Sequence, residues 1–344
     1  MTGLSHVLLF STLIATSFMS TFSQTPATES LFDNRFDTLI EEKQASATLS
    51  LEEVFEEKKP LDLSFENVKM LDKDSGNVLE MDLEEYVAGV LLAEMPTWYH
   101  EEALKAAAVA VRTYTVYKMN SSAHPLGASV CNDPSHCQAF YTLPDAVEAW
   151  SEKSAVGALD KVQKAALDTK GEVAVYNGKP ILAMYHASGY LKTRSSKEVF
   201  GGEVFYLQSV DVPFENEETS DFSTRRFDGK RVEKLLLDGG FLKSQDAPFQ
   251  VRDVWEDGKC MGLEIASGGE KTLVSPFKVR EVFSLKSANF KVVKDGDEYV
   301  FEVFGYGHGV GMSQKGAHLL ACDGMNYEQI LSHYYRGIDI AILK

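Results

Sequence analysis

The spacing of hydrophobic residues predicts a β-hairpin followed by two adjacent helices near the start of the folded region. Residues 68–80 have strand character on either side of the turn-forming residues 74–76. From Leu83 the hydrophobic period changes to that of a helix, which we expect to end at Pro96. A second helix is expected over residues 100–119, whose many alanines would let it lie close to its neighbour.

Further strands are predicted downstream, so the chain combines helices and strands in a mixed α+β fold. The strand-like segments are 173–186, 204–212, 250–254, 290–294 and 299–304. Residues 213–285 carry scattered charge and glycine, and we interpret them as an insertion or accessory subdomain.

The composition is that of an ordinary globular protein, with 44% hydrophobic and 25% charged residues in a chain of 344. The net charge of −17 argues against a nucleic-acid partner, because phosphate binding depends on clustered lysine and arginine. The acidic balance alone identifies no substrate.

The N-terminal part of the chain differs from the rest. Residues 4–23 contain no Asp, Glu, Lys or Arg and are rich in apolar side chains. Their length fits a secretory signal or one membrane-spanning helix at 1–24, and a buried hydrophobic terminus is the alternative. Residues 25–63 are polar and acidic, which predicts a tether, and we expect the folded domain over 64–344.

Glu94 is the candidate for catalysis. It is the last acid of the first predicted helix and directly precedes Met95 and Pro96. Apolar neighbours and the negative end of the helix dipole both favour a protonated carboxyl group at this position. A general acid that acts on a glycosidic oxygen near neutral pH needs such a raised pKa. A solvated glutamate at a helix end is the alternative interpretation.

A short segment carries two histidines and two cysteines: His124, Cys131, His136 and Cys137. Two imidazoles and two thiolates form a tetrahedral ligand set for Zn²⁺, and a site closed by four protein ligands would be structural. Proline, glycine and asparagine around these residues predict a loop that can wrap an ion. A Cys131–Cys137 disulfide and two unrelated thiols are the alternatives.

Residues 305–317 contain four glycines at alternate positions, which is incompatible with a packed helix or an ordinary strand. The glycines surround His308, and Ser313 and Gln314 follow them. Such a backbone lets another chain or a ligand approach closely, and the composition suits a groove floor that binds a polar polymer. A glycine-rich turn with a chance histidine is the alternative.

The glycine-rich segment resembles the GHGxGMSQxGA signature of the SpoIID/LytB family, named for stage II sporulation protein D. Three more segments match family motifs in the family's order, at 85–114, 185–207 and 330–335. Together the four segments span roughly residues 66 to 344. The resemblance therefore implies a SpoIID-like catalytic core, in which 213–285 carries no family signature.

The resemblance implies that Glu94 is the acid and base of a peptidoglycan lytic transglycosylase. The acid would protonate the glycosidic oxygen beyond N-acetylmuramic acid. The resulting carboxylate would then take the proton from the C6 hydroxyl of that sugar, which closes on C1 to leave a 1,6-anhydro end. A hydrolase of the common type would need two carboxylates. No second obvious candidate acid accompanies Glu94 in the matching segments, and an acid from a distant part of the chain that folds beside it is the alternative.

The resemblance also implies which residues bind the glycan in the groove. The set is Arg112, Tyr185, His186, Ser188, His308, Met312, Ser313 and Gln314. Arg112 would orient Glu94 or cap a helix. Gly189 stands where the family pattern has serine, and Ala107 replaces the usual glutamine; Ser188 could supply the missing hydroxyl.

Partners and location follow from the same resemblance. It implies glycan strands without stem peptides as substrate, an amidase-type partner similar to stage II sporulation protein P, and a role in engulfment during sporulation. It also implies an N-terminal membrane anchor with the catalytic part outside the cytoplasm, and zinc at the His/Cys cluster. The alternatives are a non-catalytic peptidoglycan-binding enhancer of an amidase, and a zinc hydrolase, which the closed ligand set disfavours.

Overall fold

The computed structural model describes residues 58–63, 67–121, 124–245 and 248–344, and it confirms the mixed α+β fold class. The helices are α2 (Leu83–Glu94), α3 (Glu101–Ser121), α4 (Leu143–Ala149), α5 (Glu152–Asp168), α6 (Ser196–Phe200), α7 (Gly229–Asp238), α8 (Pro276–Val282), α9 (Gln314–Cys322) and α10 (Tyr327–Tyr334), with a 3-10 turn η1 at Pro125–Gly127. The strands are β1 (Pro60–Leu61), β2 (Asn67–Leu71), β3 (Val78–Asp82), β4 (Val130–Cys131), β5 (Glu172–Tyr176), β6 (Lys179–Pro180), β7 (Tyr185–His186), β8 (Phe222–Asp228), β9 (Phe249–Glu256), β10 (Lys259–Ser267), β11 (Glu270–Val274), β12 (Asn289–Asp295), β13 (Glu298–Phe304), β14 (Met312–Ser313) and β15 (Asp339–Leu343).

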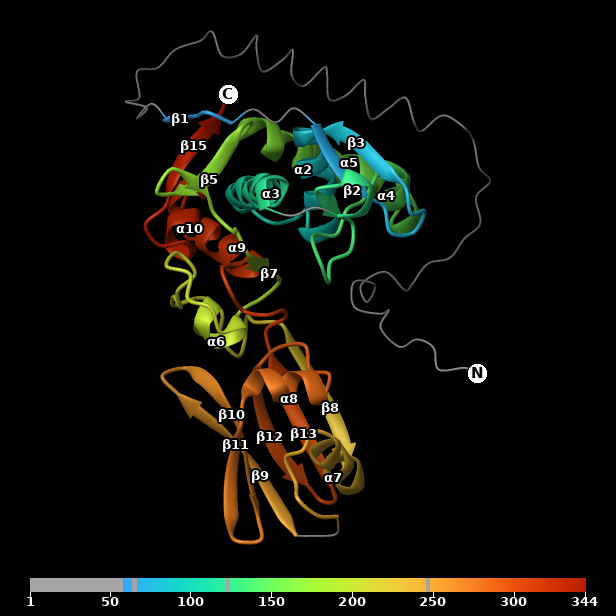
Figure 1. Ribbon diagram of the computed structural model, residues 1–344, viewed down its shortest axis with the longest axis vertical. Helices are drawn as coiled ribbons and strands as arrows, with labels where there is room; N and C mark the ends of the chain where they lie inside the picture. Colours follow the sequence, from blue (N-terminus) through green and yellow to red (C-terminus); the bar gives the residue numbers. More distant parts are fainter. Residues whose placement is uncertain (1–57, 64–66, 122–123, 246–247) are drawn as a thin grey trace.

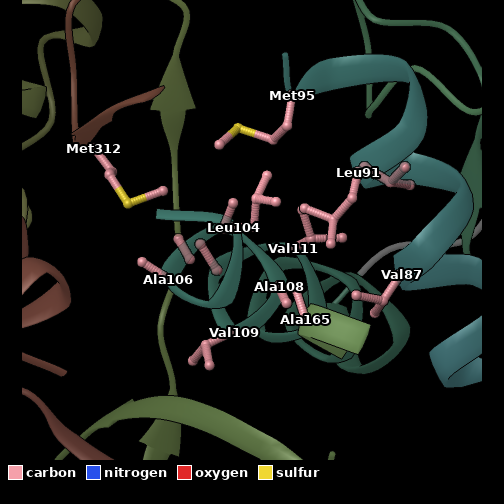
Figure 2. Packing of buried hydrophobic residues seen from close by; sticks show 14 of the residues in the cluster. Val87, Leu91, Met95, Leu104, Ala106, Ala108, Val109, Val111, Ala165 and Met312 are labelled. Atoms are coloured by element: carbon pink, nitrogen blue, oxygen red, sulfur yellow. The ribbon is translucent and has the colours of Figure 1, made fainter. Parts of the chain in front are cut away.

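The first hydrophobic core is built around α3, which contacts α2, α5, α9, α10 and β5. Its alanines at 103, 106, 107, 108 and 110 are all buried, so small side chains face neighbours on several sides. Figure 2 shows Ala108 of α3 close to Val87 and Leu91 of α2 and Ala165 of α5, with Ala106 on the other side of α3, toward Met312. The alanine-rich sequence thus allows close helix packing, as the pattern predicts.

Short strands surround this helical core. The predicted hairpin forms from β2 and β3, and β4 adds to β2 in parallel. A second small sheet has the order β1-β15-β5-β6, in which β15 joins the C-terminus to the first described strand. A third pairs β7 with β14 in parallel. The last pairing brings together segments that are far apart in the sequence.

A second hydrophobic core lies at the other end of the molecule's long axis (Figure 1). It contains the antiparallel sheets β11-β10-β9 and β12-β13-β8 together with α7 and α8. Its buried residues run from Val232 to Val303, so β12 and β13 belong to it although they follow the segment 213–285. The first core, by contrast, contains Val212 and resumes at Val310.

The structure corrects two of the predicted strands. Residues 204–212 form no strand. Their backbone groups make isolated hydrogen bonds, such as the one from Thr193 N–H to the Val210 carbonyl (2.8 Å), and not a continuous ladder. The segment 173–186 divides into β5, β6 and β7, since a turn at Asn177 and Gly178 with positive φ interrupts it. The expected strands at 250–254, 290–294 and 299–304 are confirmed.

The predicted anchor at 1–24 and most of the tether at 25–63 lie outside the described residues. Within the described ranges, no helix combines the length and the apolar character needed to cross a bilayer.

Candidate functional site

Glu94 is the final residue of α2, and the chain geometry around it explains why the helix ends there. Asp82 caps the N-terminus of α2 by accepting hydrogen bonds from Glu84 and Glu85 N–H. Met95 is extended, with φ −107° and ψ 129°, because the following Pro96 disfavours the helical conformation at the residue before it. Glu94 is therefore carried on a rigid helix, at a point where the chain turns away.

The Glu94 carboxyl group is only partly exposed and is held by two neighbours. The Ala139 N–H donates to Oε1 at 2.8 Å, and the Gln314 side chain also hydrogen-bonds the carboxylate. Burial raises the pKa of Glu94, and these two hydrogen bonds offset part of that rise. The direction agrees with the requirement for a general acid, and desolvation is the main cause.

The glycine-rich segment folds tightly against residues 184–189. Gly305, Gly307, Gly309 and Gly311 all have positive φ. A Cβ on Gly311 would lie 1.9 Å from the Met184 carbonyl oxygen, so only glycine permits this approach. Beyond it, β14 pairs with β7 and leads directly into α9, whose first residue is Gln314. The glycines thus bring Gln314 to Glu94.

We expect Gly311→Ala to destabilise the fold by about 3 kcal/mol, because it adds a backbone clash to an unfavourable positive φ. Thermal unfolding measures the effect. Gly157→Ala is the matched control, since nothing lies within 4 Å of the added methyl group and the residue is inside helix α5. Equal stability of the two variants would contradict the role of Gly311.

Two of the predicted binding residues lie on β7, opposite the glycines. Tyr185 accepts a hydrogen bond from Gln138 Nε2 at 2.7 Å, and burial, together with the Glu94 charge, raises the pKa of its phenol. The His186 ring is buried, and its Nδ1–H donates to the Val310 carbonyl at 3.2 Å. Burial lowers the pKa of His186 to about 3, so this imidazole is neutral near pH 7.

His308 is partly exposed, and its ring centroid lies 5.8 Å from that of His186. Burial and the charge of Arg280 lower its pKa to about 4. It is therefore a neutral hydrogen-bonding group at the site and not a cation near pH 7.

Three other predicted binding residues are buried beneath the residues of the site. Met312 and Ser313 are completely buried, and the Ser313 hydroxyl accepts the Gly316 N–H at 3.0 Å as the cap of α9. Ser188 is also buried and donates to Glu215 Oε1 at 3.1 Å. The expectation that these three side chains line the groove is corrected by their burial: they support the residues that do.

Of the two sequence-based roles of Arg112, the structure contradicts the orientation of Glu94 and supports the capping of a helix, because Arg112 donates to a carbonyl in the last turn of α5. Its side chain is fully buried and forms an ion pair with Glu84, at the opposite end of α2 from Glu94. It also donates to the carbonyls of Ala166 and Glu172. Arg112 thus joins α2, α5 and β5, and it neither orients Glu94 nor reaches a ligand.

Sequence reasoning missed Glu215, a buried carboxylate beside the site. Its Oε1 accepts the Gly189 N–H at 2.7 Å, and burial raises its pKa. Its Oε2 has no hydrogen-bond partner among the described residues. The absence of a side chain at Gly189 makes room for this carboxylate, since a Cβ there would lie 2.9 Å from Oε2. In the sequence Glu215 is only the first of several acids that follow an apolar stretch at 212–214, and nothing distinguishes it from the others.

The four predicted metal ligands converge on one point. The ligand atoms of His124, Cys131, His136 and Cys137 all lie within 4.8 Å of one another. Cys131 Sγ lies 3.5 Å from His136 Nδ1, and Cys137 Sγ lies 3.4 Å from His124 Nε2. A tetrahedral Zn²⁺ with ordinary bond lengths separates a sulfur and a nitrogen ligand by about 3.5 Å. The arrangement therefore fits zinc, and the two thiols are free of a disulfide.

The loop that carries these ligands continues directly into the site. Gln138 follows the ligand Cys137 and hydrogen-bonds Tyr185, and the next residue, Ala139, donates to Glu94. An ion bound at the cluster would cross-link the loop and hold these two donors in place.

Comparison with known proteins agrees with this site. The family model described as "Stage II sporulation protein" matches residues 72–176, a range that contains α2, α3 and the His/Cys cluster. Stage II sporulation protein D of Bacillus amyloliquefaciens is 32% identical over 270 residues, covering 77% of this chain and 76% of the relative. The chain belongs to the stage II sporulation protein D family.

Two further relatives extend the range of the family. Stage II sporulation protein D of Bacillus subtilis strain 168 is 29% identical over 310 residues, covering 87% of this chain and 88% of the relative. A protein named amidase enhancer from the same strain is 26% identical over 309 residues, covering 72% of this chain but 39% of that protein. Membership in the stage II sporulation protein D family connects the chain with sporulation and suggests a role at the cell wall.

Proposed function

We propose that this protein is a lytic transglycosylase that cleaves peptidoglycan glycan strands and leaves 1,6-anhydro-N-acetylmuramic acid ends. The observation that carries the proposal is the placement of Glu94. It is a partly exposed carboxyl group with a raised pKa on a rigid helix end, and it is held by Ala139 and Gln314.

The reaction uses Glu94 twice. The protonated carboxyl group donates its proton to the glycosidic oxygen as the bond to C1 of N-acetylmuramic acid breaks. The carboxylate so formed accepts the proton of that sugar's C6 hydroxyl, whose oxygen bonds to C1. The proton count on Glu94 is restored, and no water is consumed. Tyr185 and Gln314 lie beside this carboxyl group, and Gln314 is a buried side chain that hydrogen-bonds it. Tyr185 and His308 are partly exposed and are the proposed contacts to the sugar.

The proposal extends to the metal and the setting of the reaction. The His/Cys cluster would hold a structural Zn²⁺ that cross-links the loop behind Glu94. We further propose that the protein is anchored outside the cytoplasm by its N-terminal segment. There it acts during engulfment on strands from which an amidase partner has removed the stem peptides.

A second candidate is a peptidoglycan-binding protein that enhances an amidase without cleaving glycan. The relative named amidase enhancer favours it, because most of this chain aligns with part of that protein. Both candidate functions would bind glycan at the same residues. They differ in whether Glu94 transfers a proton.

The products distinguish these possibilities. Glycan without stem peptides should yield 1,6-anhydro ends, which carry no reducing group and are one water lighter than hydrolytic ends. In ¹⁸O-labelled water these ends should contain no label, as mass spectrometry can show. Labelled reducing ends would require an activated water and a second carboxylate, for which Glu215 is the buried candidate. No cleavage at all would favour the amidase enhancer.

A further inference from the structure

Two cations, on or just after helix α8 of the second core, lie beside the glycine-rich segment of the site. Lys286 Nζ lies 5.4 Å from the centroid of the Tyr306 ring, and the Lys286 carbonyl accepts the Gly307 N–H at 3.1 Å. Arg280, on α8, acts electrostatically on Tyr306, His186 and His308. Lys286 therefore lies against the segment that the glycines form, and Arg280 lies within electrostatic range of the same segment.

Neither cation has a carboxylate partner within the described part of the chain. The ion pairs found there include eighteen other lysines and arginines but not Arg280 or Lys286. The chain has 51 acidic against 34 basic residues, so acids to pair with are abundant. Arg280 is also partly removed from water, and burial lowers its pKa. Two cations that act on the same tyrosine and lack a carboxylate partner are suited to an anion supplied from outside the chain.

Tyr306 connects these cations with the catalytic carboxyl group. Both Arg280 and Glu94 act on the pKa of its phenol, in opposite directions. Arg280 and Glu94 are therefore close enough to one tyrosine to serve the same bound molecule.

We infer that Arg280 and Lys286 bind the lactyl carboxylate of N-acetylmuramic acid, and that this contact selects glycan from which the stem peptide has been removed. The inference rests on the proposed function and adds the feature by which the substrate is recognised. In intact peptidoglycan the lactyl carboxyl group is part of an amide bond to the stem peptide and carries no charge. Hydrolysis of that amide releases a carboxylate on the sugar itself.

The two side chains suit this group in different ways. The Arg280 guanidinium can donate two parallel hydrogen bonds to a carboxylate, and the Lys286 ammonium adds a compact charge. An amide at the same place offers no charge and leaves both cations without a compensating anion. The reaction that supplies the substrate must therefore be an amide hydrolysis at the lactyl group.

The test uses one glycan preparation in two forms, with the lactyl carboxyl groups free or converted to primary amides. The full chain is compared with Arg280→Gln, Lys286→Gln and the charge-conserving Arg280→Lys. Lys234→Gln is the matched control, because Lys234 is an exposed cation on α7, a helix that packs into the second core. Affinity for both glycans is measured in the Glu94→Gln background, and kcat/KM is measured with Glu94 intact.

We expect the protein to prefer the free carboxylate by about tenfold or more in kcat/KM and in affinity. Arg280→Gln should remove most of this preference by raising KM for the free-carboxylate glycan, while KM for the amidated glycan stays the same. Arg280→Lys should retain part of the preference. Lys234→Gln should change neither value. An equal loss on both glycans, or no preference in the unaltered protein, would overturn the inference. If the unaltered protein cleaves neither glycan, the proposed function fails, and the affinities still decide whether the carboxylate is recognised.

Discussion

Replacing Glu94 by glutamine should lower glycan cleavage by about 10²–10⁴-fold while the protein still folds and binds glycan. Glutamine keeps the shape of the side chain and can still accept the Ala139 N–H, but it cannot transfer a proton. Release of anhydro ends measures the rate, and thermal unfolding together with glycan binding shows that the site is intact. Glu148→Gln, an exposed position on α4, is the control.

The pH dependence of the cleavage rate is a second test of Glu94. Cleavage needs the protonated carboxyl group, so the rate should fall as pH rises through the pKa of Glu94. Because burial raises this pKa, the fall should occur at higher pH than for an exposed glutamate. Wild-type function of Glu94→Gln in cells would instead identify the protein as a non-catalytic enhancer.

Purified protein should contain about one zinc per chain, and Cys137→Ser should release it. Loss of the ion should lower the free energy of unfolding by about 3 kcal/mol or more, since binding energy at a structural site contributes to folding. Elemental analysis and thermal unfolding measure the two effects. Cleavage should fall as well, because Ala139 and Gln138 directly follow the ligand Cys137.

Cys322→Ser is the matched control for the zinc prediction. Cys322 is an exposed free thiol near His318 and lies outside the ligand cluster, so its loss should change neither zinc content nor stability. A Cys131–Cys137 disulfide in metal-free protein would contradict the assignment.

Features that depend on neighbours in the chain were accessible from the sequence. The β2–β3 hairpin, the helices α2 and α3, and the end of α2 at Glu94 follow from hydrophobic period, turn residues and Pro96. The His/Cys cluster was recognisable because its four residues lie in one loop. The four alternate glycines correctly indicated a close backbone approach, although not that its partner is the chain at 184–189.

Features that depend on distant segments were decided by packing. Arg112 pairs with Glu84 because α2, α3 and α5 bury both side chains together, and no local pattern reveals that pairing. Glu215 reaches the site because Gly189 leaves space for its carboxylate, and Lys286 lies near Tyr306 because its carbonyl holds the Gly307 N–H of the glycine-rich segment. A periodic pattern tells which face of an element is buried, but the partner of a buried charge depends on which elements meet. That is why Glu94 and its neighbours Tyr185 and Gln314 could be proposed as candidates from the sequence, while the burial of Arg112 and Ser188 and the position of Glu215 emerged only from the fold.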